Sequence, residues 1–165
     1  MQDAEFRTIF EAHQDAVYRF AWRMTGAAGT AEDVAQETFL VLWRAPERYD
    51  PARGTVRAFL LGVARNLVLK RWHAEGRWTS LDDSEDAVAP VPPADWQTAE
   101  KVGFAVQTLA PLQREAVVLV EYEGLTLEEA ARAVGADVGT VKSRLHRARE
   151  NLRRMLAPLR GGGVQ

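Results

Sequence analysis

The sequence has 165 residues, of which 47% are hydrophobic and 27% charged, and this composition is typical of a folded globular protein. It has no apolar run of membrane-spanning length and no cysteine, which excludes disulfides and thiolate metal sites and favours a cytoplasmic protein without membrane insertion. The net charge is −2, so any affinity for nucleic acid must come from a local basic patch rather than from the overall charge.

The first segment, residues 3–24, is predicted to form an amphipathic helix. Its apolar residues recur at spacings of three and four, which is the period of one helix face. His13 lies on that face, and no partner His or Cys stands at a metal-ligand spacing, so we interpret it as a core or boundary histidine. Gly26 and Gly29 are predicted to break the helix.

A second helix is predicted to start at Thr30, with Asp33 in the capping-box position, and to end before Pro46. Its N-terminal half is acidic and rich in amides, whereas residues 39–43 are five consecutive apolar residues that must surround most of the helix. Such a helix is either central in its domain or presents an apolar surface to a partner. Composition alone favours the central position.

Residues 46–55 form a loop rich in Pro, Gly and Asp, and a third helix is predicted over residues 56–73. The apolar side chains are expected to face inward and the polar ones outward, the polar set being Arg57, Arg65, Asn66, Lys70 and Arg71. Cations interleaved with aromatic rings and Asn are suited to single-stranded nucleic acid, because rings stack on bases and cations follow the phosphates. A solvated basic face is an equally good interpretation of the same pattern.

Residues 77–98 have no periodicity, a cluster of acids and three prolines, and are predicted to be a linker. The linker could occupy a basic channel of a partner or simply be solvated. It divides the chain into two helical parts, and the second part is expected to begin with helices over residues 98–109 and 111–123.

The stretch TLEEAARAVGADVGTVKSRLHRARENLRRML, residues 126–156, has the form of a helix-turn-helix. Thr126 and Glu129 have the capping-box spacing, Gly135 can end the first helix in the left-handed conformation, and Asp137 can cap the second. From Asp137 to Arg154 there are six Lys or Arg residues against two acids. The predicted architecture is therefore all-α, with two small helical domains and a helix-turn-helix in the C-terminal, four-helix one.

Motifs for catalysis are missing from the sequence. There is no nucleophile motif, no phosphate-binding Gly loop and no HExxH, and the three histidines fall on separate predicted helices. We therefore expect no enzymatic activity, no cofactor and no metal.

Three segments together, AEDVAQETFLVLWR (residues 31–44), FLLGVARNLVLKRW (residues 59–72) and the segment from Arg114 to Leu156, closely resemble the bacterial sigma factors of the extracytoplasmic-function (ECF) type. The resemblance covers nearly the whole chain in the family's order. It implies sigma region 2 at residues 1–76, the linker at 77–98, region 4 at 99–160 and a disordered tail at 161–165. It also implies an alternative sigma factor that binds core RNA polymerase, through the β′ clamp helices and the β flap, and that is bound by an anti-sigma factor.

The resemblance assigns roles to particular positions. Core-polymerase binding falls on Asp33, Gln36, Glu37 and Leu40. Melting and reading of the single-stranded −10 element fall on the loop at residues 49–55 and on Arg57, Phe59, Arg65, Asn66 and Lys70. In double-stranded −35 DNA, base contacts fall on Lys142, Ser143, His146 and Arg147, and phosphate contacts on Thr140, Arg144 and Arg149. The linker would run toward the active-site channel of polymerase. His146 occupies a position that varies among these factors, so the promoter sequence is not predictable.

Two alternatives of other classes compete with this reading. A stand-alone helix-turn-helix regulator would need a dimer to reach useful affinity, and the sequence has no evident dimerisation helix. A sigma-like protein that only titrates an anti-sigma factor would have no use for the basic second helix.

Overall fold

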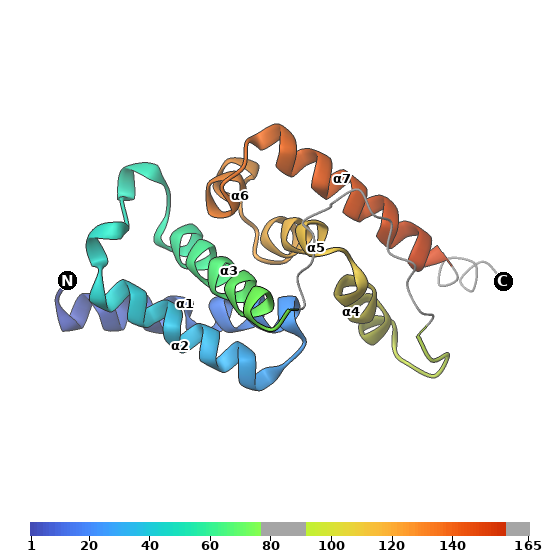
Figure 1. Cartoon of the computed structure of the whole chain (residues 1–165), viewed down its shortest axis with the longest axis horizontal. Helices are drawn as coiled ribbons and strands as arrows, with labels where there is room; N and C mark the ends of the chain where they lie inside the picture. The colour runs from blue at the N-terminus through green and yellow to red at the C-terminus, as the bar shows by residue number, and fades with distance from the viewer. Residues whose placement is uncertain (77–91, 158–165) are drawn as a thin grey trace.

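The computed structural model describes residues 1–76 and 92–157, and every regular element in these ranges is helical (Figure 1). The all-α prediction is therefore confirmed. Most of the predicted linker, residues 77–91 with its four clustered acids, lies outside the described residues, as does the predicted tail at residues 161–165. No helix in the described ranges is long and apolar enough to cross a membrane.

The N-terminal half, residues 1–76, contains three helices that pack on one another: α1 (Asp3–Thr25), α2 (Ala28–Arg44) and α3 (Val56–Ala74). Gly26 ends α1, as predicted, and it adopts the left-handed conformation. The predicted start of α2 at Thr30 was wrong, since the helix begins at Ala28 and includes Gly29. The reversal at Gly26 and the extended Ala27 already redirect the chain, so the new helix starts at once, with Ala28 and Gly29 exposed.

The loop before α3 is ordered by its prolines and caps. It holds two short 3₁₀ helices, η1 (Pro46–Arg48) and η2 (Pro51–Arg53), each with proline in its first turn. The Asp50 carboxylate accepts a hydrogen bond from the Ala52 amide at 3.0 Å, and the Thr55 hydroxyl accepts one from the Ala58 amide at 3.1 Å. Thr55 is thus the N-cap that starts α3.

The C-terminal half, residues 92–157, contains α4 (Thr98–Thr108), α5 (Pro111–Val117), the turn η3 (Val118–Tyr122), α6 (Leu127–Val134) and α7 (Val138–Met155). A single helix was predicted up to residue 123, but its last turn is π-helical. The Glu123 amide donates to the Val118 carbonyl at 2.9 Å, five residues back. The wider turn leaves Glu123 buried at its end, with 4% of its surface exposed.

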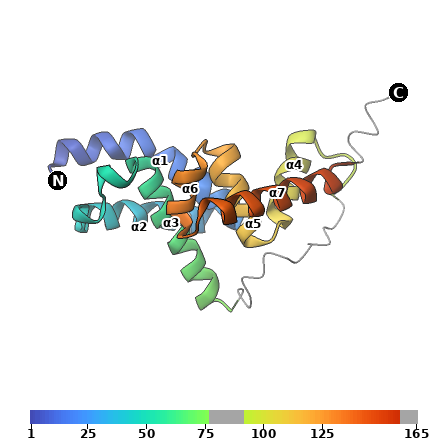
Figure 2. The same cartoon turned by 90° about the horizontal axis from the view of Figure 1, so that it is seen from above.

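The two halves share one hydrophobic core. Figure 1 shows α3 between the α1–α2 layer and α6, and the main core cluster includes Leu61 and Val68 of α3 together with Leu119 and Ala130 of the C-terminal half. In Figures 1 and 2, α7 runs away from α1 and α2. The prediction that Arg57 and Arg65 face outward was wrong, because both lie half-buried where α3 meets the C-terminal half.

Candidate nucleic-acid interface

The helix-turn-helix is built by the caps that its sequence predicts. The Thr126 hydroxyl accepts from the Glu129 amide at 3.1 Å, and the Glu129 carboxylate accepts from the Thr126 amide at 3.0 Å, which completes the capping box. Gly135 is left-handed with φ of 69°. The Asp137 carboxylate accepts from the Thr140 amide at 2.7 Å and starts α7. The hydrogen bonds to backbone amides lower the pKa of both Glu129 and Asp137.

The predicted recognition helix, α7, packs through one face and exposes the other. Val141, Leu145 and Ala148 are buried against the rest of the C-terminal half. A buried amide pair, in which Asn151 donates to Gln113 at 2.7 Å, fixes α7 on α5. The four predicted base-contacting side chains are all exposed on the first turns of α7, namely Lys142, Ser143, His146 and Arg147. The N-terminal part of a recognition helix is the part that enters the major groove, and these four exposed side chains stay predicted base contacts.

The predicted phosphate contacts differ in their surroundings. Thr140 and Arg144 are half-buried, whereas Arg149 is exposed and pairs with Glu121 of η3, its Nε donating at 2.9 Å. An exposed pair of this kind is held weakly, so a DNA phosphate can compete for Arg149.

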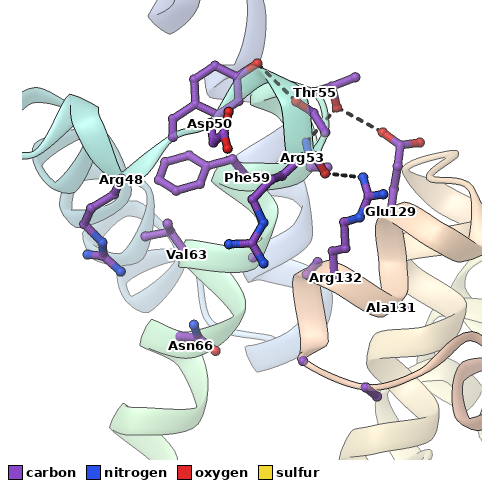
Figure 3. A pocket seen from close by; sticks show the side chains of 17 residues that line it. Arg48, Asp50, Arg53, Thr55, Phe59, Val63, Asn66, Glu129, Ala131 and Arg132 are labelled. Carbon is purple, nitrogen blue, oxygen red and sulfur yellow. Dashed lines mark hydrogen bonds between the residues drawn. The ribbon is translucent and has the colours of Figure 1, made fainter.

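A cavity of about 400 Å³ lies between the loop before α3 and α6 (Figure 3). Phe59 and Asn66 line it from α3, and Glu129 and Arg132 line it from the helix-turn-helix. The Tyr49 ring lies 5.5 Å from that of Phe59, and the Tyr49 hydroxyl donates to the Gly54 carbonyl at 3.2 Å. Aromatic rings, an amide and nearby arginines provide stacking and hydrogen-bonding groups of the kind that hold an unstacked base.

The residues predicted to bind the −10 strand fall into two groups. Asn66 and Lys70 are exposed and Phe59 is half-buried at the cavity. Arg57 and Arg65 are instead paired with Glu123 and Glu115 of the C-terminal half. Neither acid was predicted from the sequence to pair with these arginines. Glu115 did carry a signal, because it falls among buried apolar residues of its helix, where a carboxylate needs a counter-charge.

The predicted polymerase-docking residues form one exposed patch on α2, comprising Asp33, Gln36, Glu37 and Leu40. Arg71 of α3, predicted to face outward, donates to Glu37 at 2.9 Å and lies 4.0 Å from Asp33. Leu40 is 43% exposed and Trp43, one turn further, is 44% exposed.

An aromatic cluster continues the α2 patch and was not singled out from the sequence as a surface. The Phe6 ring lies 5.1 Å from Trp43, and the Phe10 ring lies 4.9 Å from Phe39. Phe6 and Phe10 come from α1, so the apolar area spans two helices. The run of five apolar residues at 39–43 therefore both fills the core and presents an apolar surface. Phe39 and Leu42 are buried, while Leu40 and Trp43 are exposed.

His13 is half-buried, which confirms the interpretation as a boundary histidine. Burial first, and the Arg57 charge second, lower its pKa. Its Nδ1 has no hydrogen-bond partner in the part of the chain that the structure describes. Within residues 1–76 and 92–157, no group of His, Cys, Asp or Glu side chains could hold a metal ion.

Comparisons with known proteins agree on both halves. Residues 9–77 match the model for Sigma-70 region 2, and residues 99–152 match that for Sigma-70 region 4. The chain is 37% identical over 157 residues to the ECF RNA polymerase sigma factor SigE of Mycolicibacterium smegmatis, covering 90% of this chain but only 60% of that protein. It is 32% identical over 165 residues to the ECF RNA polymerase sigma factor SigL of Mycobacterium tuberculosis, covering 94% and 91% of the two chains.

Solved structures give the same answer for the fold. The sigma factor RpoE in complex with the anti-sigma factor NepR, from Bartonella quintana, superposes with a TM-score of 0.75 at 28% identity, over 93% of this chain and 97% of that one. CnrH in complex with the cytosolic domain of CnrY superposes with a TM-score of 0.72 at 24% identity, over 95% and 90%. Both likenesses span the two halves together, so the arrangement of the halves and not only their separate folds is shared.

Proposed function

Because the chain belongs to the ECF sigma factors of RNA polymerase, we propose that it binds core RNA polymerase and directs promoter recognition and transcription initiation. The observation that carries the proposal is the presence, in one chain and in order, of both sigma regions, with their predicted surfaces on different helices. In this proposal the chain supplies binding surfaces and no catalytic group, and it acts in the cytoplasm, on the nucleoid once it is part of the holoenzyme.

The α2 patch is proposed to dock on the clamp helices of the β′ subunit. Asp33 and Glu37 keep more than 45% of their side chains exposed even while they face Arg71, and Leu40 adds exposed apolar area beside them. Acids next to apolar residues suit a partner helix that is basic and amphipathic. Trp43 extends the same surface and is proposed to take part.

Promoter binding is divided between the halves. The exposed side chains at the start of α7 are proposed to read −35 bases in the major groove, with Thr140, Arg144 and Arg149 at phosphates. Phe59 and Asn66, on the α3 side of the cavity, are proposed to hold an extruded base of the −10 strand, with Arg57, Arg65 and Lys70 along the backbone. The division at residues 1–76 and 99–160 into two domains belongs to the same proposal, as does a linker that reaches toward the active-site channel.

An anti-sigma factor is the expected regulator. The structure that superposes with a TM-score of 0.75 is a sigma factor bound to such a protein, and this chain shares its arrangement over 93% of its length. We propose that a protein of this class binds the chain in the arrangement described here, and that the β flap contacts the C-terminal half in holoenzyme.

The test is run-off transcription with purified core polymerase on a genomic library. Transcripts that start downstream of a shared pair of sequence elements, and only when the chain is added, are the expected result. The stand-alone regulator remains the second candidate, and it differs in a simple measurement. Tight, sequence-specific binding of the free protein to promoter DNA, together with no stimulation of core polymerase, would favour it over a sigma factor.

A further inference from the structure

Two carboxylates of the C-terminal half are buried against arginines of the N-terminal half. The Glu123 side chain is fully buried, and Arg57 Nη2 donates to it at 2.8 Å. Arg19 and Arg23 of α1 approach the same carboxylate at 3.3 and 3.6 Å. Arg57 also donates to the Glu123 backbone carbonyl at 2.8 Å. One carboxylate therefore gathers three guanidinium groups from two helices of the other half.

The second carboxylate, Glu115, makes a two-point pair with Arg65. Arg65 Nε donates at 2.7 Å and Nη2 at 3.1 Å, while only 1% of the Glu115 side chain is exposed. Burial raises the pKa of Glu115, and the hydrogen bonds and charge of Arg65 oppose that rise. The arginine fork matches the carboxylate here as it would match a phosphate.

Further contacts close the same interface. A Cβ at Gly62 of α3 would lie 3.3 Å from both Cα and O of Ala133 in α6, so the absence of a side chain permits this close approach. The Thr55 hydroxyl donates to Glu129 at 3.0 Å, and Arg132 donates to the Arg53 carbonyl. The capping groups of α3 and α6 are thus joined to each other across the halves.

We propose that Glu115 and Glu123 form a carboxylate latch that keeps the two halves together in the free protein and withholds Arg57 and Arg65 from DNA. The two acids occupy the positions against these arginines that phosphates of the −10 strand would otherwise take. This inference rests on the proposed function, because Arg57 and Arg65 count as DNA-binding groups only within it.

The chemistry of the latch makes it reversible. A buried ion pair gains little over well-packed apolar residues, since the cost of removing two charges from water offsets most of their attraction. Glu115 and Glu123 become accessible to water when the halves separate, and each arginine can then exchange a carboxylate for a phosphate. The latch therefore determines which arrangement the free protein adopts without holding it too tightly for polymerase or DNA to open.

The test exploits the absence of native cysteine. Spin labels placed at the exposed positions Gln14 in α1 and Glu128 in α6, as Q14C and E128C, report the distance between the halves. The latch predicts one short-distance population in the parent chain. Glu123→Gln removes the charge, and Gly62→Leu inserts a side chain against Ala133, so each should add a longer-distance population by an independent route.

Matched controls are available for both variants. Glu121→Gln removes an exposed pair within the C-terminal half, two residues from Glu123, and Gly103→Leu adds the same side chain to α4, where a Cβ meets nothing within 4 Å. Both should keep the short distance. An unchanged distance distribution in both Glu123→Gln and Gly62→Leu would overturn the latch, and so would a broad distribution in the parent chain.

A second readout tests whether the latch covers the DNA-binding groups. If at most a tenth of the free protein is open, full opening should raise its affinity for labelled single-stranded DNA of random sequence at least about tenfold. Opening without a gain in affinity would contradict that part of the proposal. Because the distance measurement uses neither promoter nor polymerase, its failure is distinguishable from a failure of the proposed sigma function in run-off transcription.

Discussion

The two basic faces of the molecule, on α3 and on α7, look alike in sequence but differ in availability. The predicted base-reading side chains of α7, from Lys142 to Arg147, are exposed, whereas Arg57 and Arg65 of α3 are enclosed by carboxylates of the other half. The difference comes from contacts 50 and 66 residues apart in the chain. A charge pattern in the sequence thus identifies a candidate binding face. Whether that face is free to bind DNA depends on the residues that pack against it in the folded protein.

A variant that no longer binds core polymerase should show the strongest change, because polymerase is the partner proposed to uncover the α3 face. Reversing two charges of the α2 patch, as D33K with E37K, should raise the Kd for core polymerase at least about hundredfold, because like charges would then meet a basic partner. The same two reversals at Glu11 and Asp15, exposed on α1, should leave binding near the parent value. Gel filtration with core polymerase gives the measurement, and full binding by the D33K/E37K protein would reject the docking surface.

The next variant removes the ion pair between Arg65 and Glu115, which covers part of the α3 face. Arg65→Ala leaves the Glu115 carboxyl group buried without its partner, so the free energy of unfolding at pH 7 should fall by about 3 kcal/mol. Burial already raises the pKa of Glu115, and loss of Arg65 raises it further, so the deficit should shrink as the pH is lowered and Glu115 takes up a proton. Urea unfolding at several pH values measures both effects.

Arg65→Ala has an internal control. Adding Glu115→Gln to it removes the unpaired charge and should recover much of the lost stability. A double variant no more stable than Arg65→Ala would show that the pair contributes through packing rather than charge.

A smaller effect is expected on the exposed face. Arg147→Ala should cost about 1–3 kcal/mol on a specific −35 sequence and much less on random DNA, because an arginine at a base edge discriminates between bases. Arg153→Ala, further along α7, should weaken both DNAs equally if it contacts DNA only at phosphates. Holoenzyme binding measured by fluorescence anisotropy compares them, and an equal loss with Arg147→Ala would reassign this residue to a phosphate.

The weakest change is expected at Glu129, which belongs to the capping box of α6 and also accepts a hydrogen bond from Thr55 at the start of α3. The Thr126 amide, then the side-chain hydrogen bonds, lower the pKa of Glu129, so its contribution to stability is present above the ordinary value of 4.5 and is lost as the pH falls through its folded value. Thermal unfolding should show this loss in the parent chain, and Glu129→Gln should remove that part of the pH dependence. Thr126→Ala should cost about 1 kcal/mol at neutral pH. A parent-like pH profile in Glu129→Gln would exclude this carboxylate as the titrating group.

Local signals in the sequence predicted most of the fold. The capping box at Thr126 and Glu129, the left-handed Gly135 and the Asp137 cap are all present where expected, because such motifs depend on neighbouring residues alone. The start of α2 was misplaced because the prediction relied on the local cap motif at Thr30. The chain already reverses at Gly26, and the helix starts at Ala28.

Features that depend on distant residues could not be read from the sequence. The polar pattern of α3 predicts an exposed basic face, and nothing near Arg57 or Arg65 shows that Glu123 or Glu115 folds against it. The π-helical turn at residues 118–122, which leaves Glu123 buried at its end, has no sequence signal that we could name. Among the candidate site residues, the docking positions on α2 and the four base-contact positions on α7 are exposed, and their roles remain predictions.

We expect the covered α3 face to open when the chain joins polymerase. The spin-label distance in the labelled Q14C/E128C chain, measured first in the free protein and then with core polymerase, tests this expectation. We predict one short-distance population in the free protein and a longer one in the holoenzyme. The same short distance in a transcriptionally active holoenzyme would contradict the claim.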